Sequence, residues 1–400
     1  MKILSLTIDL PYPPVRGAQL RDFALMTRAA RQHDVVVMAL LHASSTPDEI
    51  AGMGALCDEV HALPRPPDRF LGRLRRLPGH LRKGRPVGTI DHVYDTVEAA
   101  LRERLSKGDI DILQIEHSFM APYVRAVEVS PKTRTILSMH NIGAVQYRRM
   151  VAIEPHPVHR VLAAAKARLM QGWEAPWCNR FDHVIAMSKA DAALMQKMGV
   201  DRPISVVPNG VALPDSPLPD PTERRALFVG SLEYPPNVDA ARWLATKIMP
   251  RVWARDPGVR LTVAGFGGSE KLCRTLQAKG IDVVQNPPDV VPLYQTAALA
   301  LAALRAGGGT RLKILEALAL GRPVVATRLG AEGLGLEHGK TVLFGEDPDT
   351  LAAQILRGLD DADLRSGLIT NGRALIRGAY EWDTLYGHLD AVYRGLTAPQ

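Results

Sequence analysis

Short apolar segments alternate with longer amphipathic segments along the whole chain. The short segments have strand length, and the longer ones repeat apolar residues at helical spacing. Such alternation is typical of parallel sheets covered by helices on both faces. In the first half we predict strands at 3–7, 35–39, 112–115, 135–139, 183–186 and 204–207. Helices in this half are predicted at 19–31, 91–105, 160–180 and 190–198.

The pattern restarts after a proline-rich stretch, residues 214–221, which we interpret as a linker. Strands in the second half are predicted at 226–230, 261–264, 282–284, 299–304, 324–326 and 341–344. Helices there are predicted at 238–248, 269–279, 290–294, 310–320, 350–359 and 382–396. We therefore predict an α/β protein with two doubly wound, Rossmann-like parallel-sheet domains, residues 1–207 and 208–380, and a cleft between them. Ligands of such sheets bind beyond the carboxyl ends of the strands.

Composition narrows the classes of partner. The 400 residues suffice for two domains, and the net charge of +7 favours anionic ligands. Aromatic residues make up only 5% of the chain and no nucleic-acid motif accompanies the charge, so nucleic acid is not an expected partner. Three widely separated cysteines lack metal-site spacing, which predicts reduced thiols, a cytoplasmic location and no metal. The first segment predicts a strand rather than a signal peptide, and no apolar run reaches the roughly 18 residues of a membrane span.

A glycine-rich turn between a predicted strand and a predicted helix is the strongest candidate site. Gly307, Gly308 and Gly309 follow the strand, and Thr310 opens the helix. Glycines let backbone N–H groups approach an anion, and a helix N-terminus adds partial positive charge. Arg311 and Lys313 add full charges, and Glu316 lies close enough in the helix to accept hydrogen bonds from hydroxyls. This combination predicts a nucleotide site, whereas the alternative is a tight turn with surface charges.

Further candidates lie at strand ends in the first half. Gly17 precedes a helix and could contact a phosphate oxygen, with Arg21 one turn further on, although a ligand-free proline-stiffened loop is an equal alternative. Two phosphate sites, one per domain, could clamp one diphosphate. His140 follows another strand and could bind a sugar hydroxyl or transfer a proton, unless it is structural. Glu116 and His117 are weaker acceptor-side candidates.

Two other segments have competing interpretations. Residues 264–269 resemble a dinucleotide turn but lack the full glycine spacing, so backbone packing or nucleotide contact at Gly265 is favoured over NAD binding. The basic stretch from Arg65 to Arg85 carries leucines at helical spacing, which suits an anionic membrane surface or a lipid-phosphate acceptor. The alternative is a solvated helix that packs its leucines on the first domain, because prolines interrupt the pattern. Its other basic residues are Arg69, Arg73, Arg75, Arg76, Arg82 and Lys83.

The chain resembles a retaining glycosyltransferase of the GT-B fold, in the large "family 4" group and its bacterial exopolysaccharide and surface-glycan branch. The resemblance extends over nearly the whole chain. The segments that carry it are 13–17, 188–191, 207–211, 228–231, 308–325 and 330–334.

The resemblance implies roles for individual residues. Glu316 would contact the donor ribose, as the second carboxylate of a Glu-x7-Glu pair. The first would fall on Gly308 and is missing, so the amides of Gly308, Gly309 and Thr310 would contact the sugar. His140 matches a histidine that contacts the donor sugar. The resemblance also assigns donor binding to Asn209, Gly230, Ser231, Gly265 and, in the base-binding loop, Val290.

One departure from the family concerns the diphosphate. An Arg and a Lys often follow the strand that ends at Gly230, whereas this chain has Ser231 there, followed by 233–234. Arg311 and Lys313 are the expected substitutes. The final helix, within residues 381–400, would cross back onto the first domain.

The expected activity is that of a retaining hexosyltransferase that uses a UDP- or GDP-linked sugar. The acceptor would be a glycan, a lipid-linked molecule or a small molecule, and no cofactor is expected. A cytoplasmic location with peripheral contact to the anionic inner membrane face is also expected. A nucleotide-sugar epimerase or phosphorylase, and a non-catalytic nucleotide-sugar-binding subunit, remain alternatives on the same fold.

Overall fold

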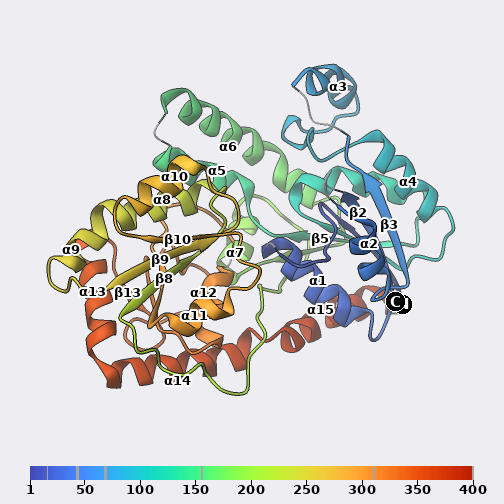
Figure 1. Cartoon of the computed structure of the whole chain (residues 1–400). Coiled ribbons are helices and arrows are strands. Elements are labelled where there is room, and N and C mark those ends of the chain that lie inside the picture. The colour runs from blue at the N-terminus through green and yellow to red at the C-terminus, as the bar shows by residue number, and fades with distance from the viewer. Residues whose placement is uncertain (16, 42–44, 67–69, 155, 310, 399–400) are drawn as a thin grey trace. The chain divides into compact units, whose positions relative to one another are not determined.

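Two parallel sheets organise the chain, one in each of two compact units (Figure 1). Unit 1 comprises residues 1–146, 164–208 and 382–400, and unit 2 comprises residues 147–163 and 209–381. The structure is a computed structural model that describes residues 1–15, 17–41, 45–66, 70–154, 156–309 and 311–398. Arg69 and Thr310, both named from the sequence, lie outside the described residues, as does Arg16 within the segment 13–17.

Unit 1 contains a seven-stranded parallel sheet with the order β3-β2-β1-β4-β5-β6-β7. Its strands are β1 (Lys2–Thr7), β2 (Asp34–Leu41), β3 (Glu59–Pro64), β4 (Ile112–Glu116), β5 (Arg134–Met139), β6 (His183–Ala186) and β7 (Ile204–Val206). Successive side chains point to opposite faces, so Ile3 joins one apolar core and Leu4 the other. Both faces are therefore buried, as expected of a parallel sheet.

Helices cover both faces of this sheet, and α15 packs beside α1 in unit 1 (Figure 1). The helices are α1 (Gly17–Ala29), α2 (Pro47–Gly54), α3 (Phe70–Arg82), η1 (Val87–Thr89), α4 (Asp95–Leu105), η2 (Ser118–Val129), α7 (Lys189–Lys197) and α15 (Trp382–Thr397). Trp382, Leu385 and Leu389 bury one face of α15 in the core that also contains Ile3. Two further helices, α5 (Gly143–Ile153) and α6 (Pro157–Cys178), contain residues of both units.

Unit 2 contains a six-stranded parallel sheet with the order β10-β9-β8-β11-β12-β13. The strands are β8 (Arg225–Val229), β9 (Arg260–Gly265), β10 (Asp282–Gln285), β11 (Leu299–Ala302), β12 (Val324–Ala326) and β13 (Leu343–Phe344). The helices are α8 (Pro235–Trp243), η3 (Leu244–Ile248), α9 (Met249–Trp253), α10 (Glu270–Gln277), α11 (Val291–Thr296), α12 (Leu312–Ala319), α13 (Pro348–Asp360) and α14 (Ala362–Ala379). Phe228 and Leu227, adjacent on β8, enter the cores on opposite faces.

The α/β prediction is confirmed, and every predicted strand is present with small shifts at its ends. The structure adds the strand β3 and the helical segments α2, η1, η2, α5, α9 and α14, which the pattern did not predict. Strand β3 is an edge strand with half-buried residues, so it lacks the apolar run that marks a central strand. Residues 147–163, counted in the first domain from sequence, group with unit 2. Among the described residues, no helix is long and apolar enough to span a bilayer.

Candidate functional site

Two glycines at neighbouring strand ends open a small space in unit 2. Gly265 ends β9, and Gly230 follows β8. A Cβ on Gly265 would lie 1.9 Å from the carbonyl oxygen of Gly230, so only glycine permits this approach of the two backbones. A Cβ on Gly230 would lie 2.7 Å from Nζ of Lys313. Gly265 therefore lets the two strand ends approach, and Gly230 leaves room for the lysine at the carboxyl ends of the strands, where parallel sheets bind ligands.

Lys313, on α12, is held in an unusual environment for a lysine. Its Nζ donates a hydrogen bond to Oδ1 of Asn237 (2.9 Å) and lies 4.1 Å from the ring centroid of Phe228. Burial lowers the pKa of Lys313 to about 7, with a further contribution from the charge of Arg311, whereas Glu316 opposes the change. Lys313 is half-buried by its accessible surface, and protein atoms pack closely around its ammonium group. Within the part of the chain that the structure describes, no carboxylate lies at salt-bridge distance from this ammonium, so the position favours an incoming anion.

Glu316 lies one turn beyond Lys313 on the same helix. Burial raises the pKa of Glu316, and the charge of Lys313 counteracts the rise. The hydroxyl of Tyr294, on α11, donates to the carbonyl oxygen of Lys313 at 3.2 Å and fixes this helix against α11. Val290 precedes α11 and packs against the adjacent apolar core. The backbone of Ser231 holds Asn237 in place beside Lys313, because Nδ2 of Asn237 donates to the carbonyl oxygen of Ser231 at 2.9 Å.

The glycine turn before α12 has a left-handed backbone at two positions. Gly307 has φ = 115° and Gly309 has φ = 70°, conformations that favour glycine. Arg311 is 7% exposed, and its Nη1 donates to the carbonyl oxygen of Gly308. A Cβ on Gly307 would lie 3.2 Å from Nη2 of this arginine. Arg311 therefore braces the turn through contacts with its backbone, in addition to any role toward a ligand.

Unit 1 has a buried ionisable cluster at the ends of β4 and β5. Nε2 of His140 lies 2.8 Å from Oε2 of Glu116 and 3.4 Å from Oδ1 of Asp22. The His117 ring stacks on the His140 ring with centroids 3.7 Å apart. His117 also has φ = 72°, a strained backbone for a residue with a Cβ. Such an arrangement of histidines and carboxylates at strand ends can exchange or hold a proton.

The two carboxylates of this cluster stabilise the positive charge of His140 but repel each other. Burial alone would lower the pKa of His140, but Asp22 and Glu116 outweigh it and raise the pKa to about 9. Burial and the charge of Glu116 raise the pKa of Asp22 to about 6. Burial, followed by the charge of His140, lowers the pKa of His117 well below its usual value. At neutral pH the cluster therefore contains an imidazolium beside a neutral imidazole.

Other side chains hold the cluster in place. Nη1 of Arg21, on α1, donates to the carbonyl oxygen of Pro208 at 2.7 Å. The hydroxyl of Tyr393 donates to Oε1 of Gln114 at 2.6 Å, and the amide of Gln114 donates to Glu116. The connection is local to unit 1, since α15 supplies Tyr393 and β4 supplies Gln114.

Three atoms of this cluster satisfy a distance criterion for a cation site. Ligand atoms of Asp22, His117 and His140 lie within 4.8 Å of one another. The two imidazole planes are stacked at 29°, so their in-plane lone pairs do not converge on one point. Nε2 of His140 also already faces Glu116. The arrangement thus favours a proton-sharing cluster over a cation site.

The structure groups most predicted site residues into these two places. Gly230, Ser231, Gly265, Lys313 and Glu316 gather in unit 2, and Arg21, Glu116, His117 and His140 gather in unit 1. Gly17 is an exposed residue at the start of α1, and Asn209 begins the second segment of unit 2.

Sequence reasoning missed four participants, namely Asp22, Gln114, Asn237 and Phe228. Asp22 was detectable, because it falls on the same face of a predicted helix as Leu25 and Met26, one turn further on, which are buried. Asn237 also had a signal, since the two prolines before it mark the start of a helix in the segment that follows a strand.

Comparisons with known proteins agree with this architecture. A family model described as "Glycosyltransferase Family 4" matches residues 23–213, and one described as "Glycosyl transferases group 1" matches residues 223–361. An "uncharacterized 44.6 kDa protein in cps region" of Klebsiella pneumoniae is 22% identical over 89% of this chain and 90% of its own length. Glycogen synthase of Mycobacterium tuberculosis is 29% identical over 49% of this chain and 50% of its own length.

Solved structures share the fold over nearly the full length. Anabaena Alr3699/HepE, in complex with UDP and glucose, has a TM-score of 0.70 at 16% identity, covering 99% of this chain and 100% of that chain. Sucrose-phosphate synthase from Thermosynechococcus elongatus has a TM-score of 0.74 at 16% identity, covering 99% of each chain.

Proposed function

Since the chain is a glycosyltransferase with the GT-B fold, we propose that it transfers a hexose from a UDP- or GDP-linked sugar with retention of configuration. The acceptor is a glycan, a lipid-linked molecule or a small molecule. The observation that carries this proposal is Lys313, a lysine with a pKa of about 7 in a space bounded by Gly230 and Asn237. A bound diphosphate would favour the protonated form of this lysine, and the attraction between the two charges would stabilise the complex.

The remaining donor contacts follow from the same region. Glu316, close to Lys313 on α12, is assigned to the ribose hydroxyls, because a carboxylate accepts two hydrogen bonds from a diol. Val290 is assigned to the base, beside α11. Gly308 and Gly309 are assigned to the sugar and phosphate through their backbone amides. The complex of Anabaena HepE with UDP and glucose supports a donor of this chemical type.

The proposed reaction is a substitution at the anomeric carbon. The bond to the diphosphate oxygen breaks, and a bond to the acceptor oxygen forms on the same face of the sugar. The acceptor proton goes to a phosphate oxygen of the leaving diphosphate, so a separate protein base is not needed. Lys313 stabilises the charge that develops on the diphosphate, an effect typically worth about 3–4 kcal/mol per fixed donor. His140, protonated at neutral pH, is assigned a hydrogen bond to a sugar hydroxyl.

We further propose that the chain acts in the cytoplasm without a metal or other cofactor. Its three cysteines, Cys57, Cys178 and Cys273, are free thiols, which suits a reducing compartment. A lysine at the diphosphate supplies the positive charge that a divalent cation would otherwise provide. Donor turnover that is unchanged by EDTA is the expected result. A role in surface-glycan assembly is proposed from the relative in the cps region of Klebsiella pneumoniae.

The deciding experiment measures donor turnover with and without acceptor. The purified chain is first screened by thermal shift against UDP-, GDP-, dTDP- and ADP-sugars, and the stabilising donor is then incubated with candidate acceptors. Acceptor-dependent release of the nucleoside diphosphate, with product of unchanged anomeric configuration, is expected. A donor sugar altered without acceptor would indicate an epimerase. Tight donor binding with no turnover under any acceptor would indicate a binding subunit.

A further inference from the structure

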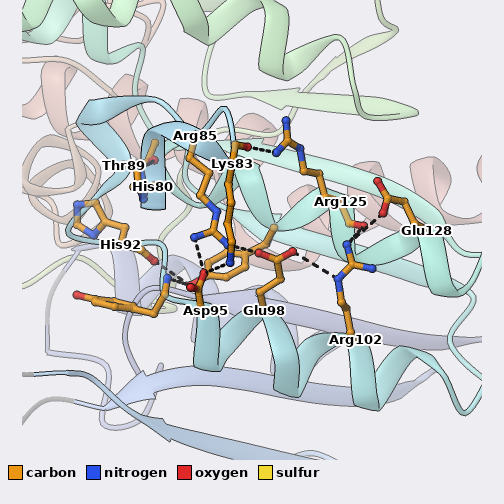
Figure 2. A network of polar contacts seen from close by, with 12 residues as sticks. His80, Lys83, Arg85, Thr89, His92, Asp95, Glu98, Arg102, Arg125 and Glu128 are labelled. Atoms are coloured by element: carbon orange, nitrogen blue, oxygen red, sulfur yellow. Dashed lines mark hydrogen bonds and ion pairs between the residues drawn. The ribbon is translucent and has the colours of Figure 1, made fainter. Parts of the chain in front are cut away.

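The basic stretch around α3 is largely occupied by internal ion pairs. Figure 2 shows Lys83 and Arg85 converging on Asp95, each at 2.7 Å, and Arg85 also pairing with Glu98. Arg73 pairs with Asp91 at 2.9 Å. These contacts fasten the segment to unit 1. Paired guanidinium groups have less to gain from an external anion, so α3 is a weaker candidate for membrane contact than its sequence implied.

Helix α6 presents an apolar stripe to solvent. Four large apolar side chains on it are more than half exposed, namely Val158 (57%), Val161 (69%), Leu162 (55%) and Leu169 (53%). Their spacing of three, four and seven residues places them on one face, together with the exposed Ala165. The opposite face is buried through Ala167, Met170 and Glu174. Because α6 already buries one face, a second, outward apolar face requires its own explanation.

Basic residues border this stripe on both sides. On a helical projection Arg168 lies beside one edge of the stripe and Lys166 beside the other. From 156 to 173 the chain contains Arg160, Lys166 and Arg168 but no Asp or Glu. An apolar stripe between cations is the pattern of a helix that lies in the plane of an anionic membrane, with its side chains among the acyl chains.

We propose that the outward face of α6 docks the protein on an anionic lipid surface. The charge pattern favours lipid over a second copy of this chain, because two such faces would bring Lys166 and Arg168 close to their own equivalents. Docking does not depend on the proposed transfer reaction, but it would place the enzyme where a lipid-linked acceptor resides. Helix α3 differs, since among the side chains described there the exposed large apolar ones are Leu74 and Leu81, which lie two turns apart.

Vesicle binding tests this proposal without any substrate. The full chain is sedimented with vesicles of equal parts phosphatidylglycerol and phosphatidylcholine, and with vesicles of phosphatidylcholine alone. The triple variant Val158→Ser, Val161→Ser, Leu162→Ser is expected to lower the partition coefficient roughly tenfold to hundredfold. The pair Lys166→Gln, Arg168→Gln is expected to lower binding to the anionic vesicles roughly tenfold and to abolish the preference for them.

The matched control is the α3 variant Leu74→Ser, Leu81→Ser, which removes equally exposed leucines from the other basic segment. It should bind vesicles like the wild type. Unchanged circular dichroism and thermal midpoint show that each variant is folded, as expected for exposed positions. Loss of binding in the α3 variant alone, or no binding by the wild type, overturns the proposal. A wild-type dimer that the α6 variant dissociates would instead make the stripe a self-association surface, which also overturns it. Donor turnover is measured separately, so failure of docking leaves the proposed function intact.

Discussion

Lys313→Met should stabilise the ligand-free protein near neutral pH while weakening donor binding. The wild-type lysine has a folded pKa of about 7 against 10.5 for an ordinary lysine, because burial penalises its charge. Methionine has similar length and no charge, so it removes the penalty. It also removes the donor to Oδ1 of Asn237, which costs about 1–3 kcal/mol.

The size of the effect depends on pH in a defined direction. Between pH 7 and 10.5 the unfolded chain binds more protons at this lysine than the folded chain, so wild-type stability rises with pH. A difference of about 3.5 pH units corresponds to about 5 kcal/mol, of which most applies at pH 6.5 and about 1–2 kcal/mol remains at pH 9.5. From pH 6.5 to pH 9.5, the free energy of unfolding of the wild type should therefore rise by about 3 kcal/mol relative to that of the Met variant.

Urea unfolding at pH 6.5 and 9.5 measures this difference. Tryptophan fluorescence follows the unfolding of both units, and Trp243 and Trp253 contribute the signal of unit 2, where Lys313 lies. Lys340→Met is the matched control, because Lys340 is 58% exposed in a surface pair and should change stability by no more than about 0.5 kcal/mol at either pH. Parallel pH curves for wild type and Lys313→Met would refute a lowered pKa. Donor affinity retained by Lys313→Met would refute the diphosphate contact.

Three other variants test the remaining assignments. Glu316→Ala should weaken donor binding by about 1–3 kcal/mol in calorimetry, and unchanged affinity would exclude a ribose contact. His140→Gln should lose stability relative to wild type below about pH 6.5, with the deficit shrinking by about 1–3 kcal/mol as pH rises through 9, because the folded pKa is raised; a constant deficit contradicts this. Gly265→Ala should destabilise unit 2 by at least about 2 kcal/mol, since its Cβ meets backbone, whereas Gly230→Ala meets side-chain ends and should chiefly impair donor binding; equal thermal shifts would count against that distinction.

The fold was largely predictable because both sheets are parallel and central strands are continuous apolar runs. Segments such as 35–39 and 299–304 satisfy that pattern and lie in β2 and β11. The edge strand β3 escaped prediction because solvent reaches it and its side chains are only partly apolar. Periodicity also gives no information on which loops meet. Asn237 could therefore not be paired with Lys313 from sequence, because 76 residues separate them.

The sites were predictable in part for the same reason. His140 and Glu116 were identified because each lies at or just beyond the carboxyl end of a strand, and Lys313 because it lies in the first turn of the helix that follows the glycine turn. The charge state of each residue depends on partners that are distant in sequence, such as Asp22 beside His140 at 118 residues' separation, and sequence spacing does not reveal them. Arg311 shows that a residue predicted to bind a ligand can also have a structural contact that the sequence does not reveal. Its guanidinium, which the sequence predicts to bind a ligand, also donates a hydrogen bond to the carbonyl oxygen of Gly308 in the same turn.

The two clusters reverse the usual order of protonation. In water a lysine keeps its proton to a far higher pH than a histidine, yet here the pKa of Lys313 is about 7 and that of His140 is about 9. The difference arises from partners, because two carboxylates face the histidine whereas the lysine faces a neutral amide and an aromatic ring. Near pH 8 in the ligand-free protein, His140 in unit 1 is therefore mostly protonated, whereas Lys313 in unit 2 is mostly neutral. A diphosphate that binds beside Lys313 would favour the protonated lysine, so donor binding near pH 8 should be coupled to the uptake of nearly one proton from solvent per molecule bound.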